Sequence, residues 1–545
     1  MRGLVSLAWG RLATALLLVF VHLNLAAALS VPRYSELEAR TRADLDANTV
    51  RRELGSRLSP GTLIFGPSDG KFPATTARWN TFAPPQIQVV VQPASEADVA
   101  KIGDQVQYCN ANGIDFLATN GGHGNSASLG TFTGVQISMA LLRTITIQPN
   151  KKSAWFQGGV YGGLVTKYLW ERGFVTTTGS CDCVGLLGAA LGGGHGRHEG
   201  LYGMVVDNLL QLNVVLGDGR AIRVSPTSNS DLLWGMKGAG HNFGIVTSFE
   251  LNIFPRGPDT WHYHNYIWTG AQLERVFTSL NRLHNNGSTP VNMALNFGFF
   301  FMNTTVSTTD PILSWTFAYR GPANEAEALL AEFNAIPSVY NEQGDVPYSG
   351  VSKVQGNAED DFICQKGNKR ITTTAGLQVY NLTAERLIYN GFRARAISHP
   401  TLAAGAGILH EGYSTAGVGA RNPADAAYPF RSDHHLMLFN GVVPPNDPVL
   451  EELAWEWANE VKDMWNAGQP TRTENNYVNY ANGYEDLETV YGREPWRLAR
   501  LRALKQKYDP QNKFRFYNPI VEPREGKGKG KGKGKGKGKR RWFQG

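Results

Sequence analysis

Short runs of apolar residues, each bounded by glycine, proline or polar turn residues, organise the first half of the chain. Strand-forming residues run over 87–91, and the capping sequence 95–98 predicts a helix over 99–110. A second strand is expected over 114–118, and it leads directly into the glycine-rich stretch 119–126. The pattern therefore predicts a β-α-β unit with a turn after its second strand.

The same alternation continues to about residue 255 and predicts more short strands and another helix. Strands are expected over 135–139, 145–147, 209–216, 221–224 and 246–253, and the helix over 161–172.

Beyond Pro255 the pattern changes to strand-like segments separated by charged helical stretches such as 323–335. The strand-like segments are 261–268, 293–302, 312–320, 376–381 and 434–443. This pattern predicts a second domain in which helices back an antiparallel sheet. From about Gln469 the chain is poor in glycine, and its pattern predicts a helix that ends before Pro510.

The start of the chain has the pattern of a secretory signal peptide. Arg2 and Arg11 precede an apolar run over 12–25, and alanines at 26–28 supply an A-x-A cleavage site. The run is too short to remain as a membrane anchor, and no other apolar run is long enough to cross a membrane. N-x-S/T sequons, which fit secretion, occur at Asn286, Asn303 and Asn381. The protein is therefore expected outside the cell or in the secretory pathway.

Composition and charge indicate a globular protein without a nucleic-acid-binding face. The 545 residues suggest two or three domains, and the four cysteines are too few for a disulfide framework. The formal net charge of +7 is misleading, because seven lysines over 527–539 and two arginines after them contribute nine charges, and removing these nine leaves −2. The body lies close to neutral, and the tail over 522–545 is expected to be disordered.

The stretch 119–126 is the first candidate binding site. Its glycines let the backbone approach a bulky ligand and let N–H groups point the same way, an arrangement that suits a pyrophosphate. The alternative, from these residues alone, is a surface turn with a solvated histidine. The residues concerned are Asn120, Gly121, Gly122, His123, Gly124 and Asn125.

Five motifs, in their order along the chain, resemble those of flavin-linked oxidases. They are Gly121-Gly122-His123, Cys181-x-x-Val184-Gly185, the segment 238–247 with Ile245 and Val246, Tyr477-x-Asn479-Tyr480, and the segment 508–514. Together they make the chain similar to the berberine-bridge-enzyme-like family of the vanillyl-alcohol oxidase superfamily. The resemblance covers residues 80–255 and 470–520 closely and the middle of the chain loosely.

The resemblance implies an α+β fold, in which a two-part FAD-binding domain holds an inserted substrate domain of antiparallel sheet backed by helices. The expected order is a signal peptide (1–28), an N-terminal arm (29–80), the FAD-binding domain (81–256), the substrate domain (257–468), a C-terminal return to the FAD-binding domain (469–521) and the tail (522–545). The partners implied are a small-molecule substrate and O2, with no nucleic acid. The oligomeric state is not predicted.

The resemblance also implies covalently attached FAD. In the family, the counterpart of His123 bonds the flavin 8α-methyl carbon and that of Cys181 bonds C6, and these bonds need a neutral imidazole and a thiolate. Asp182 is expected to raise the pKa of the neighbouring thiol, and Cys183 is a rival for the second attachment. The expected cofactor-binding residues are Asn120, Gly121, Gly122, His123, Gly124, Asn125, Cys181, Val184, Gly185, Ile245, Val246 and Asn479.

The catalytic base is expected in the C-terminal motif. Counting from the segment 427–431, the position of the glutamate of berberine bridge enzymes falls at Met437, which accepts no proton, so bridge-forming chemistry is disfavoured. Tyr477 and Tyr480 are the candidates for the base. The alternative for each is an aromatic side chain in a strand that packs on the FAD-binding domain.

Histidines outside the first motif are not expected to react. His434 and His435 are adjacent on a predicted strand and face opposite sides, so one of them is a candidate for lining the substrate pocket. His195 and His198 have the spacing of a metal pair, but no cysteine or carboxylate cluster beyond Glu199 completes a site, so no metal is expected.

The sequence thus predicts a secreted FAD-linked oxidase that transfers hydride from a small organic substrate to FAD and passes electrons to O2. A role in secondary metabolism is favoured, because the motif at 181–183 is Cys-Asp-Cys where sugar oxidases have Cys-Pro-Gly. A carbohydrate oxidase is the first alternative, and a non-catalytic flavin-fold binding protein is the second.

Overall fold

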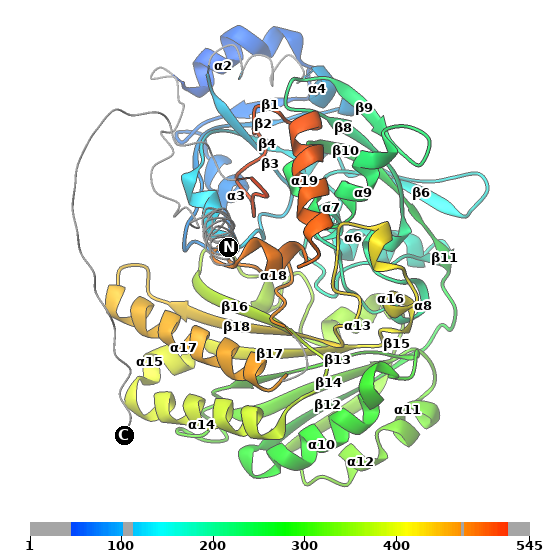
Figure 1. Ribbon diagram of the computed structural model, residues 1–545, viewed down its shortest axis with the longest axis vertical. Coiled ribbons are helices and arrows are strands. Elements are labelled where there is room, and N and C mark those ends of the chain that lie inside the picture. Colours follow the sequence, from blue (N-terminus) through cyan, green and yellow to red (C-terminus); the bar gives the residue numbers. More distant parts are fainter. Residues whose placement is uncertain (1–44, 102–108, 110–112, 470–472, 522–545) are drawn as a thin grey trace, which may run out of the picture. The chain divides into compact units, whose positions relative to one another are not determined.

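The computed structural model describes residues 45–101, 109, 113–469 and 473–521 (Figure 1). The signal peptide expected at 1–28, the tail expected at 522–545 and most of the helix expected at 99–110 lie outside these residues.

Parallel strands form the centre of the first sheet. β4 (Thr133–Ser138) lies between β2 (Gln86–Gln92) and β3 (Asp115–Thr119) and runs parallel to both. The two strands expected to form a β-α-β unit are therefore in one sheet, but a third strand that follows them in the chain separates them. α4 (Glu96–Lys101) begins the expected helix.

Residues before the expected start of this domain also belong to its sheet. β1 (Leu63–Phe65) pairs antiparallel with β2 and forms the sheet edge. α2 (Ala47–Leu54) buries Val50 and Leu54 in the same core and leaves Arg51 and Arg52 exposed. The described part of the expected N-terminal arm (29–80) therefore packs on this sheet, and the charged side of α2 faces outward.

The second sheet is antiparallel, with β10 (Ile245–Asn252) at its centre. β6 (Ser153–Gln157) and β8 (Leu209–Val215) flank β10, while β5 (Ile145–Ile147) and β9 (Ala221–Val224) form the edges. The helices packed in its core are α6 (Gly162–Trp170), α7 (Leu186–Leu191), α9 (Ser230–Ala239) and α19 (Pro495–Tyr508). Because α19 comes from the end of the described chain, the C-terminal segment returns to this part of the structure.

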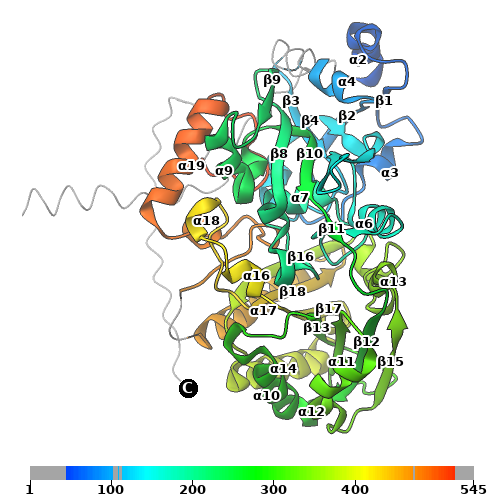
Figure 2. The ribbon, with the colours of Figure 1, turned by 90° about the vertical axis from the view of Figure 1, so that its right-hand side faces the viewer.

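A seven-stranded antiparallel sheet dominates the rest of the chain. In spatial order its strands are β15 (Tyr340–Val346), β12 (Trp261–Thr269), β14 (Ile312–Tyr319), β13 (Met293–Phe301), β17 (Ala406–Tyr413), β18 (His435–Val443) and β16 (Lys369–Leu377). The helices that cover one face are α10 (Leu273–His284), α14 (Leu382–Ser398) and α17 (Pro448–Ala467). The opposite face, called the inner face below, points toward the first two sheets (Figure 2).

The strand expected at 376–381 is displaced, because β16 ends at Leu377. The apolar pattern did not reveal the start of β16, because several residues of this strand are polar. Thr373 and Thr374 are buried, and their hydroxyls donate to the carbonyl oxygens of Ala458 and Met437, both at 2.7 Å. β15 and β17 were not predicted, and β15 is a largely exposed, polar edge strand.

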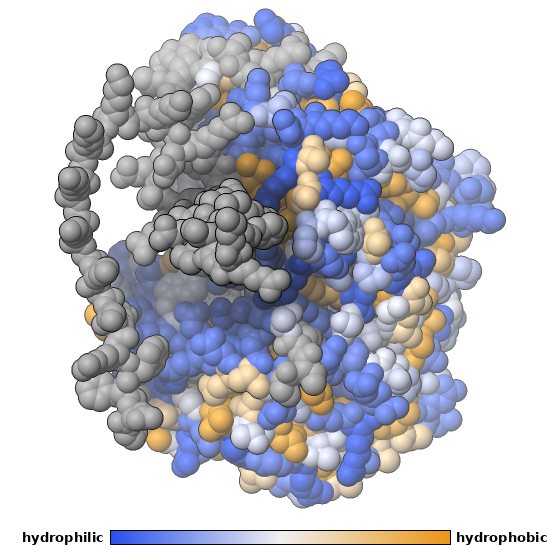
Figure 3. Space-filling view, in the orientation of Figure 1, coloured by the Kyte–Doolittle hydropathy of each residue, from blue (hydrophilic) through white to orange (hydrophobic). Residues whose placement is uncertain are grey.

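Among the described residues, no helix is both long and apolar enough to cross a bilayer. On the face shown in Figure 3, hydrophilic residues cover most of the described surface and hydrophobic ones are scattered among them. Isolated hydrophobic side chains of this kind are normal on a folded domain.

Two histidines are buried side by side on the helix-covered side of the large sheet. His284 ends α10 and His435 begins β18, and their ring centroids are 4.3 Å apart. Burial lowers the pKa of His284 to about 3. Burial, followed by the neighbouring His284, holds the pKa of His435 well below its usual value. Both rings are therefore neutral in the folded protein at neutral pH.

Acid should destabilise the fold through this pair. The folded-state pKa values lie below the unfolded value of about 6.5, so the unfolded chain binds more protons as the pH falls below that value. Each histidine held neutral then lowers the unfolding free energy by about 1.4 kcal/mol per pH unit. We expect the Tm, followed by circular dichroism, to fall more steeply from about pH 7 to about pH 5 in the wild type than in His435→Leu. Equal slopes would show that the pair does not limit acid stability.

Candidate active site

A cavity of about 360 Å³ lies between the first two sheets and the inner face of the seven-stranded sheet. Two glycine-rich loops line it, the first loop (119–125) and the second loop (179–185). Every residue that the sequence predicted to bind the cofactor or to act as the base lines this cavity. These residues are Asn120, Gly121, Gly122, His123, Gly124, Asn125, Cys181, Val184, Gly185, Ile245, Val246, Tyr477, Asn479 and Tyr480.

The first loop packs directly against the second. Nδ2 of Asn120 donates to the carbonyl oxygens of Gly158 (3.0 Å) and Val160 (2.8 Å), which anchors the first loop. Gly185 of the second loop approaches Asn120 so closely that an added Cβ would lie 2.8 Å from its Cγ. Gly122 has φ +75°, a conformation that favours glycine. The backbones of both loops therefore form one wall of the cavity.

His123 reaches the cavity from the first loop as a neutral ring. Its Nε2 is buried and has no hydrogen-bond partner among the described residues. Burial, aided by the positive charges of Lys366, Arg78 and Arg370, lowers its pKa to about 3. Trp79 stacks on the ring with centroids 6.0 Å apart. A neutral imidazole with an unpaired nitrogen is the form in which histidine acts as a nucleophile.

Cys181 lines the cavity as a thiol. Burial raises its pKa to about 12, with Glu411 as the next cause, and Asp182 acts in the expected direction but ranks below both. Cys183, the rival for the second attachment, is instead bonded to Cys364 in a disulfide that the sequence did not predict. This disulfide occupies the rival sulfur and ties the second loop to a segment between β15 and β16.

Tyr477 is held by two donors on its hydroxyl oxygen. The backbone N–H of Gly194 donates at 2.9 Å and Nδ2 of Asn479 at 2.7 Å. Burial raises the pKa of Tyr477 above its usual value. Residues 478–480 form a turn rather than the strand considered from the sequence, and the rings of Tyr477 and Tyr480 lie 5.2 Å apart at the cavity.

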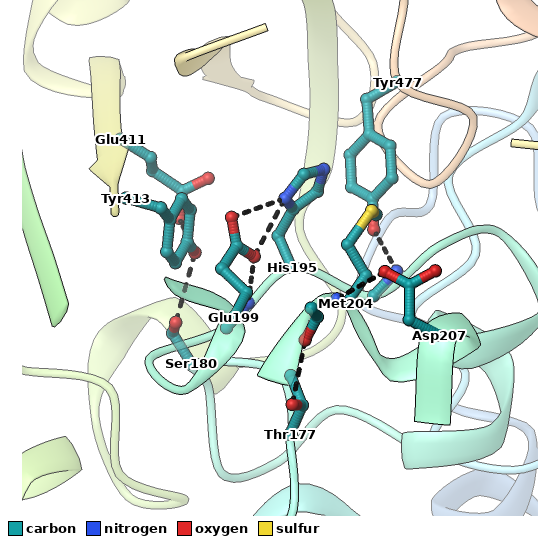
Figure 4. Close-up of polar contacts among 12 residues, drawn as sticks. Thr177, Ser180, His195, Glu199, Met204, Asp207, Glu411, Tyr413 and Tyr477 are labelled. Atoms are coloured by element: carbon teal, nitrogen blue, oxygen red, sulfur yellow. Dashed lines mark hydrogen bonds and ion pairs between the residues drawn. The ribbon is translucent and has the colours of Figure 1, made fainter. Parts of the chain in front are cut away.

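Tyr480 and Glu411 form a second polar pair at the cavity. The Tyr480 hydroxyl donates to Oε2 of Glu411 at 2.7 Å. The Tyr413 hydroxyl lies 3.4 Å from the other carboxylate oxygen and 3.1 Å from Oγ of Ser180 (Figure 4). Burial raises the pKa of Glu411 to about 7. A carboxyl group that faces a ligand cavity and titrates near neutral pH is suited to general-base catalysis.

Sequence reasoning missed Glu411. The sequence placed the position of the family's carboxylate at Met437, on β18. Met437 is fully buried in the helix-covered core, while its neighbour Leu438 lines the cavity. Glu411 lies on β17, the adjacent strand, which the sequence did not predict. The signal was present, because Leu409, Glu411 and Tyr413 alternate and all three line the cavity.

His195 also lines the cavity and has two partners. Its Nδ1 lies 3.0 Å from Glu199 Oε2, and its Nε2 lies 2.9 Å from the Tyr428 hydroxyl; Figure 4 shows the contact with Glu199. His198, three residues on, has separate surroundings, since its ring packs on Tyr348 and burial lowers its pKa to about 3. His195 and His198, whose spacing suggested a metal pair, therefore lie against different neighbours.

The wall formed by the large sheet is mostly apolar. Phe297 and Phe299 of β13, Leu409 of β17 and Leu438 of β18 line it. Neither His434 nor His435 lines the cavity. His434 lies against the backbone of residue 378, and His435 is buried under the helices.

Comparisons with known proteins identify the family. Residues 87–225 match the FAD binding domain family, and residues 476–521 match the family described as berberine and berberine like. The FAD-linked oxidoreductase iacH of Pestalotiopsis fici is 49% identical over 495 residues, which are 90% of this chain and 94% of that protein. The FAD-linked oxidoreductase anuG of Penicillium roqueforti is 49% identical over 498 residues, which are 91% of this chain and 97% of that protein. The chain belongs to the berberine-bridge-enzyme-like family of FAD-linked oxidoreductases.

Solved structures confirm the fold of this berberine-bridge-enzyme-like protein. CrmK, a flavoenzyme involved in shunt product recycling in caerulomycin biosynthesis, has a TM-score of 0.73 at 22% identity, covering 86% of this chain and 100% of its own. Chitooligosaccharide oxidase has a TM-score of 0.69 at 21% identity, covering 85% of this chain and 98% of its own. The α+β class expected from the sequence is confirmed.

The cavity of this berberine-bridge-enzyme-like protein has the features that FAD requires. An added Cβ at Gly121 would lie 3.2 Å from the backbone of Cys183 and Gly185, so glycine at this position lets the two loops pack closely against each other. His123 lines the cavity beside them and has an unpaired ring nitrogen among the described residues. The two loops, together with Ile245, would hold the cofactor, with backbone N–H groups favouring its phosphates.

The contact between the loops can be tested with Gly185→Ala. The added Cβ would displace the Asn120 side chain and break its two hydrogen bonds. Leaving such groups unpaired costs about 1–3 kcal/mol, and the same loss from the binding free energy of FAD would weaken binding by about 5- to 150-fold. We expect a lower ratio of flavin to protein absorbance after gel filtration. Gly419→Ala, where an added Cβ meets nothing within 4 Å, is the matched control and should keep the wild-type ratio. If both variants keep it, the loop contact does not support the site.

Proposed function

We propose that this FAD-linked oxidoreductase is an oxidase that takes a hydride from a carbon of a small, mainly apolar organic substrate and delivers the electrons to O2. When bound, FAD supplies the hydride acceptor. The observation that carries the proposal is the Glu411–Tyr480 pair, a proton acceptor on the wall of the cavity that the cofactor-binding loops also line.

Glu411 and Tyr480 act together as the base. A substrate hydroxyl placed against the Tyr480 oxygen passes its proton to that oxygen while the Tyr480 proton passes to Oε2 of Glu411 along the 2.7 Å hydrogen bond. Tyrosine alone is a weaker candidate, because burial holds the pKa of Tyr480 well above its usual value. Tyr477 has a positioning role in this scheme and takes no part in the proton transfer, because its oxygen already accepts two hydrogen bonds.

The apolar inner face supports a flat, weakly polar substrate of the kind found in secondary metabolism. Phe297, Phe299 and Leu438 offer packing surface and no hydrogen-bonding groups. A sugar, by contrast, presents hydroxyls on every side, and buried hydroxyls need partners. Because the solved relatives include chitooligosaccharide oxidase, a carbohydrate substrate remains the alternative. The non-catalytic alternative leaves the poised carboxyl group of Glu411 without a role.

FAD is attached to the chain through His123 in this proposal. The neutral ring and the unpaired Nε2 support that attachment. A second attachment through Cys181 needs a thiolate, and the raised pKa of its thiol disfavours one.

Secretion is the last part of the proposal, and two features support it besides the signal-like start. The Cys183–Cys364 disulfide fits an oxidising compartment. Asn286 is exposed in the short 3-10 helix Asn285–Gly287 and Asn303 lies in a loop, positions where glycans are tolerated, whereas the Asn381 side chain caps α14 by accepting from the N–H of Ala384.

Replacement of Glu411 tests the base. Glu411→Gln keeps the shape of the side chain but accepts no proton, so we expect flavin reduction to slow by about 10²–10⁴-fold. In the wild type the rate should rise with pH through about 7, because Glu411 must be ionised, and the variant should lose this step. Stopped-flow bleaching of the flavin measures both. Tyr480→Phe should slow reduction similarly, and Tyr484→Phe, an exposed tyrosine outside the cavity, should not. Full activity in Glu411→Gln would assign the base elsewhere.

The attachment and the substrate class are tested separately. Acid precipitation should leave the flavin with the wild-type protein and release it from His123→Ala, which should still bind FAD through the backbone of the loops. Release from both proteins would exclude attachment at His123. An aerobic screen of phenols, alcohols and sugars, read as peroxide release, should favour the phenols and alcohols. Turnover of sugars alone would establish the carbohydrate alternative.

A further inference from the structure

A second cluster of chemically active side chains lies at one edge of the large sheet, outside the cavity. His262 and His264 are two residues apart on β12, so their side chains point to the same face. α11 (Ala323–Leu329) covers this edge and contributes Glu327. None of the three residues lines the cavity.

The donor atoms of the three side chains converge on one point. Nε2 of His262 lies 2.9 Å from Oε1 of Glu327, and Nδ1 of His264 lies 2.8 Å from the same oxygen. The three ligand atoms lie within 4.8 Å of one another. Two imidazole nitrogens and one carboxylate oxygen form a ligand set that zinc-class cations use, and a water molecule commonly completes it.

Outer contacts orient these ligands. Nδ1 of His262 lies 2.7 Å from Oδ1 of Asp345 on the edge strand β15, which directs Nε2 toward the cluster. Nδ2 of Asn334 donates to Oε2 of Glu327 at 2.7 Å, which leaves Oε1 for the two histidines. Such carboxylate and amide partners behind the ligands are typical of built metal sites.

We propose that His262, His264 and Glu327 bind a divalent cation of the zinc class, with Asp345 and Asn334 as the residues that position the ligands. The cation would join β12 to α11 at the sheet edge beside β15. Its role is structural, because the cluster is separate from the cavity that the proposed oxidase chemistry uses. This inference therefore does not depend on the proposed function.

The competing interpretation is a hydrogen-bonded network without a cation. In that network Nε2 of His262 faces Oε1 of Glu327 and Nδ1 faces Oδ1 of Asp345. With a cation at Nε2, the contact between Nδ1 and Asp345 is kept, because Asp345 is an outer partner and not a ligand. Nε2 of His264 is buried and has no partner within the described part of the chain, so it does not separate the two interpretations.

Titration of the full-length flavoprotein with Zn²⁺ tests the site. The protein is prepared without a polyhistidine tag, stripped of metal with a chelator and followed by calorimetry. We expect one Zn²⁺ per chain and a higher Tm in its presence. Co²⁺ at the same site should give absorption bands at longer wavelengths than those of the flavin.

Variants of the partly exposed carboxylates keep the test independent of folding. Glu327→Gln should weaken Zn²⁺ binding at least about tenfold, and Asp345→Asn, which removes only an outer contact, about 10–100-fold. Glu325→Gln, the same change on the same helix, should bind Zn²⁺ as the wild type does. Flavin content and circular dichroism should match the wild type in all three.

Two results would overturn the proposal. One is a wild-type protein that binds no Zn²⁺ at a one-to-one ratio, which establishes the hydrogen-bonded network. The other is unchanged binding in Glu327→Gln and Asp345→Asn, which places any bound Zn²⁺ elsewhere.

Discussion

The backbone contact between the two glycine-rich loops is the constraint on which the rest of the site depends. Asn120 anchors the first loop through the carbonyl oxygens of residues 158 and 160, and Gly185 lies against its side chain. The Cys183–Cys364 disulfide extends this contact to the other half of the chain. As a result, one side of the cavity is backbone with polar N–H groups, and the other is the side-chain surface of a sheet. A cofactor and a substrate need these two different walls.

Burial, rather than any single ion pair, sets the protonation of the reactive groups. It is the largest cause of the low pKa of His123, the high pKa of the Cys181 thiol and the pKa of about 7 at Glu411. In each case the uncharged form is favoured because the charged form loses its hydration. The consequences differ by chemistry: a neutral imidazole is a nucleophile, a protonated thiol is not, and a carboxyl group near neutrality exchanges protons readily. Burial at one cavity therefore prepares three groups for three different roles.

The large sheet separates chemistry from stability by the two-residue period of its strands. On β18, Leu438 faces the cavity while Met437 lies in the helix-covered core, and on β17 Glu411 faces the cavity while His410 lies buried on the other side. The His284–His435 pair and the proposed cation site also lie on the side that helices cover. A shift of one residue in an alignment thus exchanges a site residue for a core residue. The search for the family's carboxylate at position 437 failed for a different reason, because Glu411 lies on the neighbouring strand β17 and not on β18.

The sequence by itself determined the α+β class, most of the strands, the cofactor-binding loops and the tyrosines of the C-terminal motif. These features depend on local properties: period-two alternation, glycine at positions where backbone must approach a ligand, and short motifs. The tertiary structure alone decided three others: the placement of Glu411, the proposed base, at the cavity, the pairing of Cys183 with Cys364, and the convergence of His262, His264 and Glu327. In each, the partners are brought together by sheet register or by packing between distant segments, as in the 181 residues between the paired cysteines. Burial likewise follows from packing over the whole chain, so the pKa values that prepare the site are not encoded in any local stretch.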